Sequence, residues 1–255
     1  MNCRSKVTLI AASFWLAASA QALEAKLNKD DLPVLAPEVQ HETASKRVTS
    51  RFTRSHYKHF NLNDDFSKAI FERYVEMLDY NRNIFTQADI DSFKDWSVSL
   101  DDQLKAGNNK IAFDVYNLSM QKRFDRFAYA LTLLDKEIKF NTDEFIELDR
   151  SEAAWPKDEA ELNELWRKRV KYDALNLKMT GKEWPEIKEV LAKRYNNAMK
   201  RITQTRNEDA FQLYMNAFAR EVDPHTSYLS PRNAEQFQSE MNLSLEGIGA
   251  VLQMT

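Results

Sequence analysis

Apolar side chains recur every three or four residues through most of the stretch 38–241, a spacing that gathers them on one face of an α-helix. Boundary residues divide this stretch into successive helices. Asn63 stands at an expected N-cap and Thr86 opens an expected capping box. Gly107 and Pro224 stand where helices are expected to end. The pattern therefore predicts a mainly α protein made of many helices.

The starts of the predicted helices lie near Val39, Asn63, Thr86, Ile111, Asp158, Pro185, Asn207 and Ser230. Four residues at three-to-five spacing should form the core face of the first helix: Val39, Ala44, Val48 and Phe52. The longest pattern runs from Ile111 to Ile138, and Asn207 is expected to be an N-cap. Residues 140–157 interrupt the helical pattern and end in Trp155-Pro156.

The last residues form the only convincing strand pattern, from Leu243 to Leu252. Two of the four glycines of the chain, Gly247 and Gly249, stand within it and flank Ile248. Such a turn leaves backbone N–H groups free to point at one spot. At a strand edge it can hold the terminal carboxylate of a peptide that adds to the sheet. We therefore predict a carboxylate-binding turn.

Residues 1–22 have the form of a secretory signal peptide. Arg4 and Lys6 precede an apolar run, and Ala20-Gln-Ala22 is a suitable cleavage site. The apolar run is short for a membrane span, so we expect export with cleavage and no transmembrane segment afterwards. Residues 23–37 contain two prolines and are expected to form an extended lead-in.

The composition narrows the classes of function. A formal net charge of −3 with interspersed signs argues against a nucleic-acid interface, which needs a basic face. The presence of only four glycines argues against Gly-rich phosphate loops. The one cysteine, Cys3, lies in the predicted signal peptide, so the mature chain has no thiol nucleophile and no disulfide.

Two groups of polar residues could carry chemistry. His56 and His59 stand three apart on a predicted helix, with His41 upstream, but further ligands at zinc-site spacing are missing, so we expect no metal. The segment Asp223-Pro-His-Thr-Ser-Tyr228 suits either a turn after a helix or a catalytic loop, and we favour the turn. Ser244, beside the glycine turn, has no neighbouring base. We expect neither a catalytic residue nor a cofactor in this chain.

Several motifs taken together resemble the C-terminal processing peptidases, specifically the tail-specific proteases of Gram-negative bacteria. They are Arg51-Phe-Thr-Arg-Ser-His-Tyr57, Leu148-Asp-Arg-Ser151, Trp155-Pro-Lys157, Asp223-Pro-His-Thr-Ser-Tyr-Leu-Ser-Pro-Arg232 and Ser244-Leu-Glu-Gly-Ile-Gly-Ala-Val-Leu252. The resemblance covers essentially the whole mature chain. It implies an all-helical N-terminal domain at 38–235 and the start of a PDZ domain at 236–255.

The resemblance also implies a function for the complete protein, a periplasmic serine endopeptidase with a Ser/Lys dyad. Its PDZ domain would recognise unfolded substrates with apolar C-termini, through Gly247, Ile248, Gly249, Ala250 and Leu252 here, and a periplasmic adaptor lipoprotein and the inner-membrane surface are further expected contacts. The dyad and most of the PDZ domain would lie beyond Thr255, so we expect the chain as given to be inactive. A stand-alone helical adaptor or scaffold, or a short regulator that caps substrates, are the alternatives.

Overall fold

The computed structural model describes residues 27–241. Its α-helices are α1 Val39–Ser55, α2 Asp64–Leu78, α3 Gln87–Ser92, α4 Leu100–Ala106, α5 Lys110–Thr132, α6 Glu159–Met179, α7 Trp184–Thr203, α8 Asn207–Val222 and α9 Pro231–Met241. Three short 3₁₀ turns, Lys29–Asp31, Lys94–Trp96 and Leu133–Asp135, complete the regular structure. The described residues contain no strand, so the prediction of a mainly α fold is confirmed. The predicted strand 243–252 lies outside the described residues.

The helix boundaries follow from the capping residues. Asn63 Oδ1 accepts a hydrogen bond from the Phe66 N–H at 3.1 Å, at the start of α2. Thr86 and Asp89 form the predicted capping box of α3. Gly107 ends α4 with φ +73°, in the left-handed region that glycine enters without strain. These predicted boundaries are confirmed.

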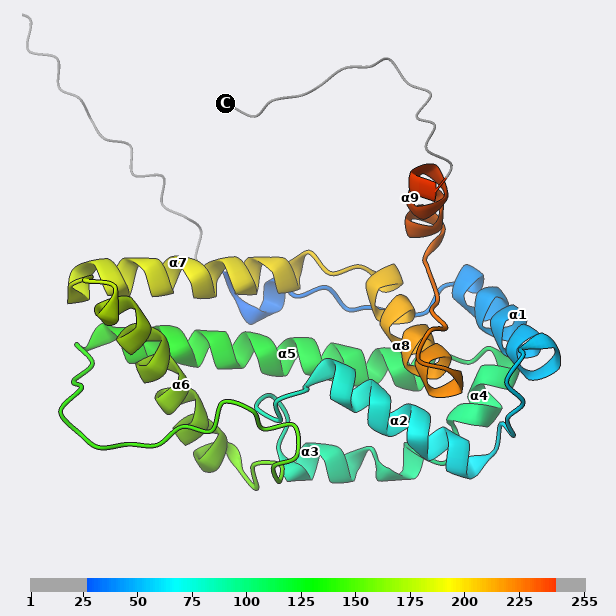
Figure 1. Cartoon of the computed structure of the whole chain (residues 1–255), viewed down its shortest axis with the longest axis horizontal. Helices are drawn as coiled ribbons and strands as arrows, with labels where there is room; N and C mark the ends of the chain where they lie inside the picture. The colour runs from blue at the N-terminus through cyan, green and yellow to red at the C-terminus, as the bar shows by residue number, and fades with distance from the viewer. Residues whose placement is uncertain (1–26, 242–255) are drawn as a thin grey trace, which may run out of the picture.

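Helix α5 runs through the middle of the body and contacts α6, α7 and α8 (Figure 1). Helix α7 runs beside it, and α6 crosses one end of the pair. At the other end lie α1, α2, α4 and α8, while α9 stands away from the rest (Figure 1). No residue of α9 is buried. The described part of the chain is therefore a long helical body that bears one projecting helix.

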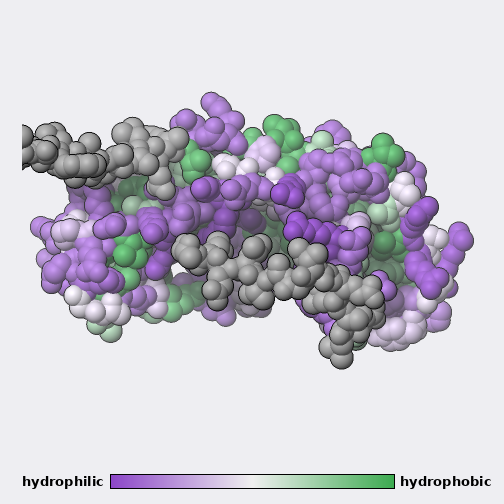
Figure 2. All heavy atoms as spheres, turned by 90° about the horizontal axis from the view of Figure 1, so that it is seen from above, coloured by the Kyte–Doolittle hydropathy of each residue, from purple (hydrophilic) through white to green (hydrophobic). Residues whose placement is uncertain are grey.

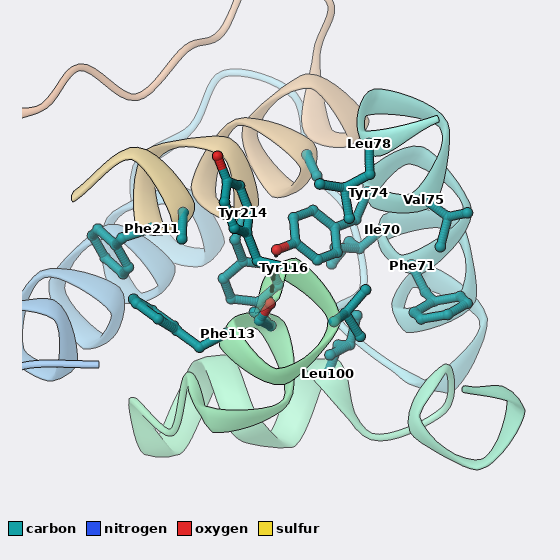
Figure 3. Packing of buried hydrophobic residues seen from close by; sticks show 14 of the residues in the cluster. Ile70, Phe71, Tyr74, Val75, Leu78, Leu100, Phe113, Tyr116, Phe211 and Tyr214 are labelled. Carbon is teal, nitrogen blue, oxygen red and sulfur yellow. Dashed lines mark hydrogen bonds between the residues drawn. The ribbon is translucent and has the colours of Figure 1, made fainter. Parts of the chain in front are cut away.

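The larger apolar core lies between α2, α4, α5 and α8 (Figure 3). Tyr74 from α2 packs edge-on against Tyr214 from α8, with ring centroids 5.5 Å apart. Its hydroxyl donates to the Ala112 carbonyl of α5 at 2.8 Å. Burial raises the pKa of both tyrosines well above the ordinary value. The three helices are thus joined by apolar packing and one buried hydrogen bond.

A second core lies between the far half of α5, α6 and α7. Leu162, Trp166, Val170 and Ala174 of α6 are spaced four apart, and at most 1% of each is exposed. Trp166 also donates its indole N–H to the Asn83 carbonyl at 2.7 Å. Apolar residues at this spacing lie on one helix face, so α6 buries a continuous apolar stripe.

The turn after α2 connects the two cores. Ile84 belongs to the second core and Phe85 to the first. The buried carboxylate of Asp79 accepts hydrogen bonds from the backbone N–H groups of Asn83, Ile84 and Phe85 at 2.8–2.9 Å. Asp79 therefore fixes the backbone where the chain passes from one core to the other.

Some sequence predictions are wrong in detail. Of the four residues predicted for the core face of α1, Ala44, Val48 and Phe52 pack against the larger core, but Val39 is 82% exposed. The fully buried residues of α1 are the polar ones His41, Ser45 and Thr49. The apolar pattern after Thr86 is not one α-helix, since residues 93–99 form turns and the 3₁₀ turn Lys94–Trp96 between α3 and α4. The pattern up to Ile138 stops being α-helical at Thr132 and tightens into a 3₁₀ turn.

Asn207 is not an N-cap but the first residue of α8, and Arg206 occupies the cap position. The Asn207 side chain binds the N-terminal segment instead. Asn207 Oδ1 accepts from the Ala36 N–H at 3.1 Å, and Nδ2 donates to the Glu38 carboxylate at 2.6 Å. The amide thus ties the approach to α1 onto the start of α8.

The face seen in Figure 2 is mostly polar, and its apolar residues form small separate patches. No helix among residues 27–241 is long and apolar enough to cross a membrane. This face therefore carries mostly polar side chains over the apolar cores.

Candidate functional site: the base of α9

The residues predicted to bind a substrate carboxylate, Gly247, Ile248, Gly249, Ala250 and Leu252, lie outside the described residues. What the structure describes is the segment that leads towards them. Residues 223–230 run from the end of α8 to the start of α9, and we call them the strap. The strap contains the motif that begins at Asp223.

The strap meets the end of α1, so two motifs far apart in the sequence come together. Tyr57 donates its hydroxyl to Asp223 Oδ2 at 2.5 Å, and these residues are 166 positions apart. His56 Nε2 and Thr226 Oγ1 lie 2.9 Å apart and share a hydrogen bond. Two neighbouring residues of one motif thus hold two residues of the other.

Asp223 also organises the strap itself. Its Oδ1 accepts from the His225 N–H at 2.9 Å, and its carbonyl accepts from the Thr226 N–H at 2.9 Å. The Tyr57 hydroxyl, helped by the His225 N–H, lowers the pKa of Asp223 below its ordinary value. The same hydrogen bond raises the pKa of Tyr57. The carboxylate is therefore ionised at neutral pH and accepts both bonds.

Helix α8 holds the second half of the strap. The Asn216 amide pairs with both backbone groups of Tyr228, and each hydrogen bond is 2.9 Å long. The Tyr228 ring packs edge-on against Phe211 at 5.4 Å, and burial raises its pKa to about 12. Gln212 Oε1 then accepts from the Ser230 N–H and from the Asn233 amide, at 3.2 and 2.9 Å.

These contacts favour the structural interpretation of the Asp223 motif. His56 and Thr226 do have the spacing of a base and a hydroxyl nucleophile. However, His56 Nδ1 faces the Lys58 backbone, so among the described residues no carboxylate orients the imidazole as in a hydrolytic triad. The arrangement fixes backbone and is suited to positioning.

The predicted placing of His56 and His59 on one helix is wrong, because α1 ends at Ser55. His41 lies near the opposite end of α1, where it is buried and stacks on Phe211 at 4.5 Å. Its Nδ1 accepts from the Glu38 N–H at 3.0 Å, and its Nε2 lies 3.1 Å from Glu208. Within residues 27–241 no three His, Cys, Asp or Glu side chains are grouped as a metal site.

Comparison with known proteins locates this arrangement in a family. A family model described as "Tail specific protease N-terminal domain" matches residues 48–232, which is well over half of the chain. The match includes the end of α1 and the whole strap, and it stops at the start of α9. A model of the B melanoma antigen family matches residues 1–36, most of which lie outside the described residues.

A curated relative shows the same likeness over a longer stretch. The chain is 50% identical over 233 residues to the tail-specific protease of Haemophilus influenzae. The aligned region is 91% of this chain but only 34% of that relative. The chain thus spans about a third of the length of the protein that it resembles.

Proposed function

This chain belongs to the family of tail-specific protease N-terminal domains, and from that premise we propose that it is the scaffold of a tail-specific serine endopeptidase. In this proposal the helical body performs no chemistry. It holds the modules that follow it in the orientation that proteolysis requires. Preorganised placement of reacting groups supplies a large share of enzymatic rate acceleration, so such a scaffold contributes to turnover without touching the scissile bond.

The observation that carries the proposal is the anchoring of the strap. On one side His56 and Tyr57, which follow α1, bind the side chains of Thr226 and Asp223. On the other side Asn216 and Gln212 of α8 bind the backbone of the strap at Tyr228 and Ser230. Helix α9 then leaves the body with no buried residue. Because the strap is anchored and α9 projects from it, the strap is suited to setting the orientation of the residues that follow α9.

The remaining parts of the proposal concern the complete protein. Residues 243–252 begin its PDZ domain, where the turn from Gly247 to Ala250 holds the terminal carboxylate of an apolar-tailed, unfolded substrate. A Ser/Lys dyad in a later segment cleaves that substrate. The signal peptide at residues 1–22 directs the protein to the periplasm, where an adaptor lipoprotein assists it.

The experiment separates positioning from binding in a complete tail-specific protease that carries this sequence at its start. The double variant Y57F/T226V removes both links between α1 and the strap and keeps the side-chain shapes. We expect cleavage of an unfolded, apolar-tailed protein to fall by roughly tenfold or more, as misplacement of reacting groups does. Binding of a labelled apolar-tailed peptide should remain within twofold, on the order of experimental scatter.

The matched control is Y172F, which removes a hydroxyl from half-buried Tyr172 on α6, far along the chain from the strap. Y172F should leave both substrate cleavage and peptide binding unchanged. Unaltered cleavage by Y57F/T226V would contradict the scaffold role. The variant G249V tests the PDZ assignment separately, since a Cβ at a permissive glycine should abolish peptide binding; retained tight binding would refute that assignment.

A further inference from the structure

A groove of about 660 Å³ lies between α2, the turn after it and the segment 151–155. Phe71 and Val75 of α2, together with Ile90 of α3, give it an apolar floor, and Trp155 forms a wall. Ser151 and Trp155 belong to two motifs that the scaffold role leaves unexplained. Glu221, near the end of α8 and two residues before the strap, also lines the groove.

The rim of the groove is acidic. Glu72, Glu76 and Glu152 line it, are exposed, and form no ion pair with any described residue. Glu72 and Glu76 are four apart on α2, where like charges repel. Lys68, one turn before Glu72, pairs with Asp65 instead, at 3.1 Å. The three rim carboxylates are therefore available to pair with cations of a bound molecule.

The two arginines of the groove are already engaged. Arg73 pairs with Glu221 at 2.7 Å. The Arg82 guanidinium lies 5.3 Å from the centre of the Trp155 ring and donates to the Ala153 carbonyl. Arg73 and Glu221 balance each other, and the one positive charge of Arg82 is outnumbered by the three exposed rim glutamates, so the groove keeps an excess of negative charge.

The wall of the groove is preformed, because contacts within the protein hold it in place without a ligand. Arg82 has φ +48°, and it is the only residue other than glycine with positive φ among residues 27–241. Such strain collects at functional sites and persists where the surroundings enforce it. Gln87 supports the wall from α3 by donating its N–H to the Pro156 carbonyl at 2.7 Å. A preformed wall reduces the ordering cost that the protein itself incurs when a peptide binds.

We propose that this groove binds an extended, basic segment of an unfolded polypeptide substrate. Lysine or arginine head groups of the guest meet Glu72, Glu76 and Glu152, and their aliphatic stems cover the apolar floor. The negative rim repels acidic segments, so charge complementarity selects the guest. The identity of the guest as a substrate rests on the proposed function; the charge preference rests on the groove alone.

The test uses the whole chain and fluorescence anisotropy with an unstructured peptide of alternating lysine, valine and serine. The peptide ends in a polar, amidated residue, so that recognition of an apolar tail plays no part. We expect salt-sensitive binding. The variant E72Q/E76Q/E152Q should weaken it roughly tenfold, the combined effect expected for three exposed ion pairs.

The control variant E189Q/E235Q/E240Q removes the same number of exposed charges from α7 and α9 and should bind like the parent. A peptide with glutamate in place of lysine should not bind. Absence of binding by the lysine peptide, or equal weakening by both triple variants, would overturn the proposal. Binding of an acidic peptide with a free apolar tail to the complete protease tests the proposed function instead, so the two failures are distinguishable.

Discussion

Helices α1 and α6 both bury a stripe of residues spaced four apart, but the stripes differ in chemistry. The stripe of α6 is apolar throughout, whereas that of α1 consists of His41, Ser45 and Thr49. The hydroxyls of Ser45 and Thr49 find no hydrogen-bond partner among the described residues. Helix α1 also packs Ala44, Val48 and Phe52, only partly buried, against the larger core. We expect it to be attached less firmly than α6, since buried apolar groups stabilise a fold and unpaired buried hydroxyls destabilise it.

The difference has a consequence for the strap. Helix α1 leads directly into His56 and Tyr57, which hold the strap, whereas α6 lies at the far end of the body (Figure 1). The more weakly attached helix thus borders the segment that leads to α9. We therefore expect the half that contains α6 to resist local opening more than the half beside the strap.

The largest expected effect is in the firm half. Trp166→Ala removes a side chain that is 1% exposed, and the resulting cavity should lower the free energy of unfolding by about 3–5 kcal/mol. Urea denaturation measures it. Leu175→Ala, at a position of the same helix that is 37% exposed, is the matched control and should lose clearly less. Similar losses in both variants would show that the α6 stripe is not the firm contact described here.

The next effect concerns the connection between the cores. Asp79→Asn leaves only one acceptor oxygen for three backbone donors, which should cost about 1–3 kcal/mol. Burial raises the pKa of Asp79 above 3.8, although its backbone hydrogen bonds oppose the shift. The folded state therefore binds the Asp79 proton more tightly than the unfolded chain does. Protonation of Asp79 thus stabilises the fold at low pH, and this stabilisation is lost as pH rises through the raised pKa.

Acidification should accordingly widen the stability gap between the parent and Asp79→Asn. Urea denaturation of both proteins, from neutral pH down towards the ordinary pKa of 3.8, measures that gap. A gap that narrows on acidification would contradict the assigned direction of the shift.

The smallest expected effect has the opposite sign. Thr49→Val exchanges a buried hydroxyl without a described partner for a methyl group of the same shape, so stability should stay level or rise by up to about 1 kcal/mol. Thr43→Val, at an exposed position of the same helix, controls for the helix propensity of valine. A loss at Thr49 well beyond that of the control would mean that the hydroxyl is satisfied, and the contrast between α1 and α6 would weaken.

These differences explain how far the sequence predicts the structure. The caps at Asn63 and Thr86 depend on neighbouring residues and form as predicted, and α6 starts where predicted, after Asp158. The core face of α1 was predicted in part, since Ala44, Val48 and Phe52 pack against the larger core. An apolar periodicity does not register the polar residues buried beside them, such as His41 and Thr49.

The site is harder to predict than the helices. The motifs that end at Tyr57 and begin at Asp223 are visible in the sequence, but their contact spans 166 positions, and helical periodicity carries no information on such pairing. Nothing in the local pattern marks Asn216 or Gln212 as supports of the strap, because both read as polar surface positions of an amphipathic helix.

Native-state hydrogen exchange resolved by residue tests the central claim most directly, because it measures the opening free energy of each helix in one sample. The account predicts that amides of α1 open at a lower free energy than those of α6. It also predicts that Y57F/T226V lowers protection in α1 and the strap while α6 stays unchanged. Protection of α1 equal to or above that of α6, together with an unchanged strap in the variant, would contradict the account.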